Sequence, residues 1–317
     1  MLGKILSITI AVLLLPTLVL YVEPFQHQNG EVLDVLILDG QSNAAYGQDI
    51  VDTDQVDIDF PNAPSRTLYY YGTDSGSTWW GTHNTPSYDT TFESYNLHEM
   101  YDNGWKVGGY EAGLGYKISE RDHHDVLILN IAVSGASVTE LSPNNPMWQF
   151  GTGVITHALE KATALNKYDS FNMLGYVWAQ GEADYSTPIK EYEAKFLKIM
   201  DGLSEYGADK CYIIATRAKW GNSVSAQYDL ANAYSNIMIA TNIANTFTVD
   251  NGLLMADGTH YTQKGRDVIA NIVGDVIDLN DSDSNDLGPL FGAVIVVVVV
   301  GIIIAAASMI FIRRNGD

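Results

Sequence analysis

The residues of this chain that could do chemistry are a serine, a histidine and an aspartate in two short clusters. Gly40-Gln41-Ser42-Asn43 ends an apolar run rich in β-branched residues, and Asp257-Gly258-Thr259-His260 stands much later in the chain. A serine hydroxyl becomes a nucleophile when an imidazole can take its proton, and the imidazole needs a carboxylate on its other nitrogen. These residue types predict acyl transfer, with Ser42 as nucleophile, His260 as base and Asp257 as the partner of its ring.

Two further clusters of small and polar residues, 134–137 and 180–182, could stabilise a developing oxyanion. Such a site needs hydrogen-bond donors that already point at the oxygen, and glycine lets the backbone approach a substrate closely. A serine after a strand is often only a turn residue, so the prediction depends on all four clusters together. We expect the donors to be the backbone N–H groups of Ser42 and Gly135 and one side-chain amide, for which Gln180 and Asn43 are alternatives.

The hydrophobic pattern predicts the elements that would position these clusters. Buried strands are expected at 32–39, 125–133, 173–178, 211–216 and 246–249, and helices at 111–121, 156–165, 188–203, 226–240 and 262–277. This alternation predicts a five-stranded parallel sheet covered by helices on both faces. Ligands of such sheets bind at the carboxyl ends of the strands, and the four clusters fall there.

A long segment, 48–109, interrupts this alternation and is expected to be a loop insertion. It is rich in Gly, Asp, Thr and aromatic residues, including Tyr69-Tyr70-Tyr71 and Trp79-Trp80. An insertion of this size in a compact domain is usually functional or disordered, and the aromatic content argues against disorder. Its aromatic rings could be stacking platforms for sugars, or the segment could be a cover that buries its own aromatics.

Composition excludes several classes of partner and cofactor. The formal net charge of −21 argues against nucleic acid as a partner. The single cysteine, Cys211, rules out an internal disulfide and a cysteine-type zinc site. The aspartates between residues 49 and 59 lack the spacing of a calcium loop. We therefore expect neither a metal nor another cofactor.

The two ends of the chain are expected to interact with a membrane. Residues 1–25 contain an apolar stretch after Lys4 and predict a signal peptide or an N-terminal membrane anchor. Residues 290–312 are apolar throughout and predict a transmembrane helix, preceded by an acidic linker at 280–289. Because Arg313 and Arg314 follow, residues 313–317 should be a cytoplasmic tail and the central domain should be extracellular at the cell membrane.

The four blocks, in this order, resemble those of the SGNH hydrolase superfamily, and most closely its sialate O-acetylesterase and acetylxylan esterase branch. The likeness extends from about Leu33 to Ile277. It implies a flavodoxin-like three-layer α/β/α domain over 30–279 that hydrolyses O-acetyl esters of sugars without a metal. For the site it implies Ser42 as nucleophile, His260 as base, Asp257 as its partner, Gly135 in the oxyanion hole, and Gln41 and Glu182 as supporting residues.

The chain departs from the superfamily at three places. Gln180-Gly181-Glu182 stands where most members have a Gly-x-Asn block, which leaves the third oxyanion donor open between Gln180 and Asn43. Ser134-Gly135-Ala136 stands where relatives often have paired glycines, and Leu141 where a tryptophan is frequent. These departures leave the preferred sugar and acyl group open.

The predicted function is therefore a membrane-anchored serine esterase, facing outward, that removes acetyl groups from glycans. One alternative is a glycan-binding surface protein that keeps the fold without catalysis. Another is an esterase for lipid acyl chains, which would need an apolar trough, whereas 48–109 is aromatic and polar.

Overall fold

The computed structural model describes residues 31–45, 67–72, 95–99 and 109–277. The expected terminal segments, the acidic linker and most of 48–109 lie outside these residues. Within the described ranges, no helix is long and apolar enough to cross a membrane.

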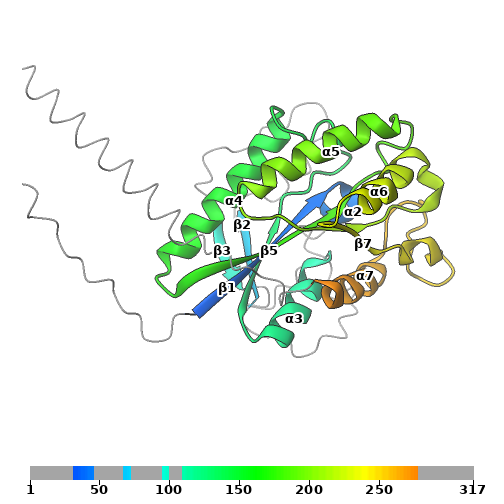
Figure 1. Ribbon diagram of the computed structural model, residues 1–317. Helices are drawn as coiled ribbons and strands as arrows, with labels where there is room; N and C mark the ends of the chain where they lie inside the picture. Colours follow the sequence, from blue (N-terminus) through cyan, green and yellow to red (C-terminus); the bar gives the residue numbers. More distant parts are fainter. Residues whose placement is uncertain (1–30, 46–66, 73–94, 100–108, 278–317) are drawn as a thin grey trace, which may run out of the picture. The chain divides into compact units, whose positions relative to one another are not determined.

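The core of the domain is one seven-stranded sheet (Figure 1). Its strands are β1 (Glu31–Gly40), β2 (Thr67–Gly72), β3 (Tyr95–Glu99), β4 (Asp125–Asn130), β5 (Tyr168–Ala179), β6 (Cys211–Ile214) and β7 (Ile237–Thr241). They lie in the order β3-β2-β4-β1-β5-β6-β7. All neighbours pair in parallel except β2 and β3, which are antiparallel.

The central strands are apolar along their length because both faces of the sheet are covered. Every residue of β4 is buried, and so is β1 from Leu33 onward. Continuous apolar runs of this kind are typical of parallel sheets between two helix layers. The central five-stranded parallel sheet predicted from the sequence is therefore present.

Helices pack on both faces of this sheet, so the domain has three layers. One layer contains α4 (Pro146–Ala164), α5 (Ile189–Ser204) and α6 (Asn222–Ala233), and the other contains α3 (Glu111–Asp122) and α7 (Gln263–Val276). The five central strands are, in chain order, β1, β4, β5, β6 and β7. If they are numbered 1 to 5, their order in the sheet is 2-1-3-4-5, which is the order of flavodoxin-like sheets.

Several expectations about the elements differ from the structure. The helix expected at 156–165 already begins at Pro146. The fifth central strand is Ile237–Thr241, not 246–249, and the preceding helix ends at Ala233 instead of continuing to 240. Tyr234 ends the helix in an extended conformation, and the short apolar run after it is compatible with either helix or strand. In addition, β2 and β3 lie inside the segment expected to be a loop insertion.

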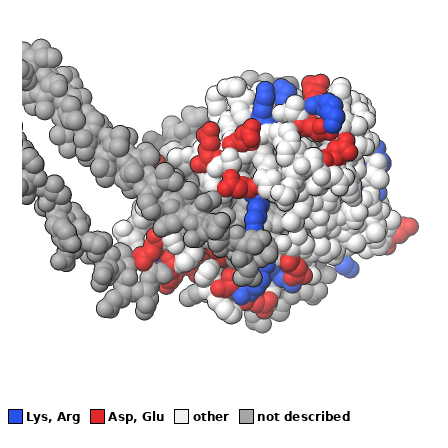
Figure 2. Space-filling model, in the orientation of Figure 1, with Lys and Arg blue, Asp and Glu red and all other residues white. Residues whose placement is uncertain are grey.

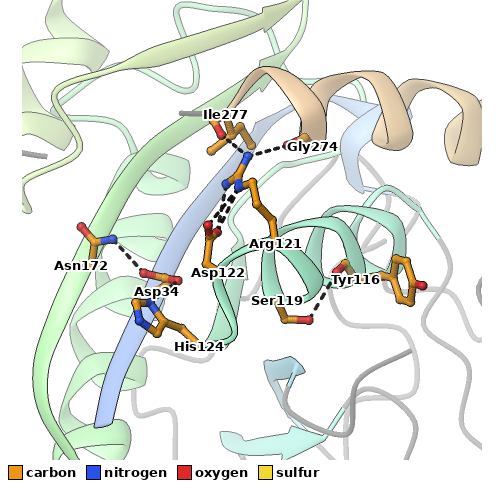
Figure 3. A network of polar contacts seen from close by, with 9 residues as sticks. All are labelled: Asp34, Tyr116, Ser119, Arg121, Asp122, His124, Asn172, Gly274 and Ile277. Carbon is orange, nitrogen blue, oxygen red and sulfur yellow. Dashed lines mark hydrogen bonds and ion pairs between the residues drawn. The ribbon is translucent and has the colours of Figure 1, made fainter. Parts of the chain in front are cut away.

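The amino ends of the strands lie opposite the edge where the predicted site residues are found. There the carboxylate of Asp34 contacts His124 at 3.0 Å and accepts a hydrogen bond from Asn172 at 2.7 Å (Figure 3). Arg121 donates to the carbonyl oxygens of Gly274 and Ile277 at the end of α7. The described domain therefore begins and ends at the edge opposite Ser42.

Candidate active site

Ser42 follows β1 directly, at the start of the short helix α2 (Ser42–Ala45). The turn depends on Gly40, whose φ is +145° and at which a Cβ would lie 2.2 Å from the carbonyl oxygen of Ala179. The N–H of Gln41 donates to that same oxygen at 3.0 Å. The close approach of β1 and β5 therefore sets Ser42 at the carboxyl edge of the sheet.

The structure brings Ser42 and Asp257 each within hydrogen-bond distance of the His260 ring. His260 Nε2 lies 2.9 Å from Ser42 Oγ, and His260 Nδ1 lies 2.6 Å from Asp257 Oδ2. The other carboxylate oxygen of Asp257 accepts the backbone N–H groups of Thr259 and His260, at 2.8 and 3.0 Å. Together these contacts form a continuous chain of hydrogen bonds from the carboxylate of Asp257 through the imidazole of His260 to the hydroxyl of Ser42. This chain of hydrogen bonds is called the relay below.

Asp257 is held in its charged form. Burial alone would raise the pKa of Asp257, but the hydrogen bonds from the His260 ring and from the Thr259 and His260 N–H groups lower it to about 2. The carboxylate is therefore ionised at neutral pH and can stabilise an imidazolium that forms at His260.

Asn43, next to Ser42, holds the backbone on both sides of His260. Its Oδ1 accepts the N–H of Tyr261 at 3.0 Å, and its Nδ2 donates to the carbonyl oxygen of Thr259 at 3.3 Å. The same Nδ2 donates to Glu182 Oε1 at 2.8 Å. Both amide hydrogens of Asn43 are thus engaged by protein acceptors, and the side chain connects α2 to the loop that carries His260.

Glu182 supports Asn43 from the interior. Its side chain is buried, and burial raises the pKa of Glu182, against the opposing effects of Asn43, His260 and Lys219. Because a carboxylate only accepts hydrogen bonds, it fixes the orientation of the Asn43 amide.

Gln41 and Gln180 brace the loop that follows β5. Gln41 Oε1 accepts the N–H groups of Gly181 and Ala183, at 3.2 and 3.1 Å. Gln180 is fully buried, and its amide donates to Ala136 O at 3.1 Å and to Asp184 Oδ2 at 2.5 Å. Neither of the two alternatives for a third oxyanion donor, Gln180 or Asn43, keeps an amide hydrogen open to a substrate.

The loop with Gly135 lies beside the turn that carries Ser42. The N–H of Val133 donates to Gly40 O at 3.0 Å, and a turn then closes from Ala136 N to Val133 O. Gly135 has a φ of +73°, the left-handed conformation that such a turn requires at its third residue. The N–H groups of Ser42 and Gly135 donate no hydrogen bond to any residue in the described part of the chain. They therefore remain the candidate oxyanion donors.

Two site residues were missed from the sequence. Asp184 accepts the N–H of Val138 at 2.7 Å and the hydroxyl of Thr187 at 2.8 Å, and so links the loops after β4 and β5. Asp39 lies under the turn of Gly40, and burial raises its pKa to about 8, opposed by the Gly40 N–H that it accepts. The sequence motif Gly-Glu-Ala-Asp after β5 is a signal that could have identified Asp184 as a site residue. Nothing in the sequence indicates that Asp39 is protonated.

The described residues hold no group of three His, Cys, Asp or Glu side chains arranged for a metal ion. Charged side chains of both signs occur in small groups among uncharged ones on the face drawn in Figure 2.

Comparison with known proteins gives one family and a set of solved structures. The sequence model for carbohydrate esterases described as sialic acid-specific acetylesterases matches residues 32–276. A protein from Arabidopsis thaliana is 14% identical with a TM-score of 0.53, over 78% of this chain and 99% of that one. NanS is 15% identical with a TM-score of 0.50, over 78% of this chain and 97% of that one. At these identities the likeness shows the fold. A search of curated proteins found no match.

Proposed function

Because the chain belongs to the sialic acid-specific acetylesterase family of carbohydrate esterases, it is a carboxylic ester hydrolase, and we propose that Ser42, His260 and Asp257 remove O-acetyl groups from sugars. The observation that carries this proposal is the relay of hydrogen bonds from Asp257 through His260 to Ser42. Ser42 lies just after the first strand, and Asp257 and His260 lie in the loop before α7.

In the proposed reaction, Ser42 Oγ bonds to the acetyl carbon while its proton passes to His260 Nε2. The negative charge that develops on the carbonyl oxygen is stabilised by the N–H groups of Ser42 and Gly135, and one such donor is typically worth about 10²-fold to 10³-fold in rate. The bond to the sugar oxygen breaks as His260 returns the proton to it. Water, deprotonated by His260, then releases acetate from Ser42 by the same route.

The test is acetate release from an aryl acetate and from O-acetylated sugars. Replacing Ser42→Ala or His260→Ala should lower kcat by about 10³-fold or more, because each removes a member of the relay. Turnover that survives Ser42→Ala would overturn the assignment. Sugar binding by the wild-type protein without turnover of any ester would favour a glycan-binding protein instead.

We also propose that a transmembrane helix at 290–312 displays the domain on the outer face of the cell membrane. The support is the apolar composition of that segment, followed by Arg313 and Arg314.

A further inference from the structure

Two aromatic side chains lie at the same edge of the sheet as Ser42. Tyr185 lies in the loop between β5 and α5, which Gln41 braces, and Trp220 ends the short helix η5 (Ala218–Trp220) after β6. The two segments are joined by a hydrogen bond from Asn222 N–H to Tyr185 O at 3.2 Å. Since β5 and β6 are neighbours and parallel, both rings belong to the carboxyl edge where ligands of such sheets bind.

Of these two rings, that of Tyr185 is displayed to solvent and that of Trp220 is half-buried beside it. Tyr185 is 58% exposed, more than any other large hydrophobic side chain in the described ranges. The Tyr185 and Trp220 rings lie 6.3 Å apart between centroids, inclined by 55°. The exposed ring of Tyr185, packed against the half-buried ring of Trp220, is therefore open to a ligand at the edge of the sheet that carries Ser42.

Basic side chains fix this pair to the turn that carries His260. The ammonium of Lys219 lies 4.4 Å from the centroid of the Trp220 ring. Lys219 Nζ and Arg217 Nη1 both donate to the carbonyl oxygen of Gly258, at 2.5 and 2.9 Å. Gly258 lies between Asp257 and His260 in the sequence, so the ring pair has a fixed place relative to the base.

We propose that Tyr185 and Trp220 form a platform on which a sugar ring of the acetylated substrate stacks while its ester lies at Ser42. This inference rests on the proposed function and names the part of the site that holds the sugar. The C–H face of a sugar ring is apolar and packs on aromatic rings, while its hydroxyl groups need polar partners. Lys219 supplies donors directly beside the Trp220 ring.

The experiment compares two substrates, an aryl acetate without a sugar and O-acetylated sialic acid. Tyr185→Ala or Trp220→Ala should lower kcat/KM for the sugar ester about tenfold, mainly through KM, because one stacked ring contributes on the order of a tenfold factor. Activity on the aryl acetate should stay within about twofold of wild type. Tyr185→Phe, which keeps the ring, should retain activity on both substrates.

The matched control is Tyr234→Ala, since Tyr234 is 41% exposed but precedes β7 at the opposite edge of the sheet. This variant should hydrolyse both substrates normally. Equal losses on both substrates for Tyr185→Ala, or no loss on the sugar ester, would overturn the platform.

A binding measurement separates this inference from the proposed function. In a Ser42→Ala background, titration with O-acetylated sialic acid should give a dissociation constant about tenfold larger when Tyr185→Ala is added. An unchanged constant would overturn the platform whether or not the protein is an esterase. If the wild-type protein releases acetate no faster than the Ser42→Ala variant does, the proposed function is contradicted instead.

Discussion

The carboxyl group of Asp39 shows how a single buried residue makes stability depend on pH. Burial raises the pKa of Asp39 from 3.8 to about 8, although the hydrogen bond from Gly40 N–H opposes the shift. Between about pH 4 and pH 8 the folded protein keeps a proton that the unfolded chain has released. The unfolded chain binds fewer protons over this interval, so the free energy of unfolding falls as the pH rises through it.

Asp39→Asn should therefore stabilise the protein, and by more at pH 8 than at pH 5. The amide cannot ionise, and its oxygen can still accept the Gly40 N–H. Thermal unfolding of both proteins at the two pH values measures this directly. A difference in Tm that is the same at pH 5 and pH 8 would contradict it.

For single residues, the sequence was sufficient to choose the three residues of the relay. It was not sufficient to predict which groups the side-chain amides of Asn43 and Gln180 bind. Ser42, His260 and Asp257 could be found because each residue type follows from the chemistry of acyl transfer. The roles of Asn43 and Gln180 depend on acceptors that fold onto them from distant segments, such as Thr259 and Asp184. Spacing along the chain carries no information about those contacts.

Among the elements, the contact of α2 with the loop after β7 positions the base. Asn43 provides this contact, because it binds the backbone of both Thr259 and Tyr261. Replacing Asn43→Ala should lower kcat about 10²-fold with KM little changed, since a displacement of about 1 Å in a reacting group has effects of this size. Steady-state kinetics on an aryl acetate would measure it.

The control for Asn43→Ala is Asn236→Ala, which removes a hydrogen bond to Asp209 O before β7, at the opposite edge of the sheet. It should leave both kinetic constants unchanged. A rise in KM for Asn43→Ala with kcat unchanged would show that Asn43 contacts substrate instead of positioning His260.

The elements themselves could be predicted where a hydrophobic period was long or a strand was wholly buried. Helix α5 and strands β1 and β4 are examples, since their apolar patterns match their burial. The strand at 237–241 was missed because its four apolar residues, 237–240, come only three residues after the end of α6 and continue its apolar pattern. Strands β2 and β3 were missed because their segment is rich in turn residues and aromatics, and pairing with β4 and with each other defines them.

For the whole molecule, the proposed orientation can be tested with introduced cysteines. Cys211 is the only cysteine of the chain and is buried, and burial also raises the pKa of its thiol, so it should not react in the folded protein. In intact cells, a membrane-impermeant maleimide should label Ser284→Cys in the expected linker. It should label Asn315→Cys in the expected tail only after lysis. Labelling of Asn315→Cys in intact cells would contradict the orientation.

The hydrogen bond between Ser42 and His260 has a consequence for protein synthesis. It joins residues that are 218 positions apart, so Ser42 is among the first described residues to be translated and His260 among the last. A chain released before residue 257 would carry Ser42 without Asp257 and His260. The proposed reaction is therefore impossible until the loop before α7 has been translated and has folded onto α2.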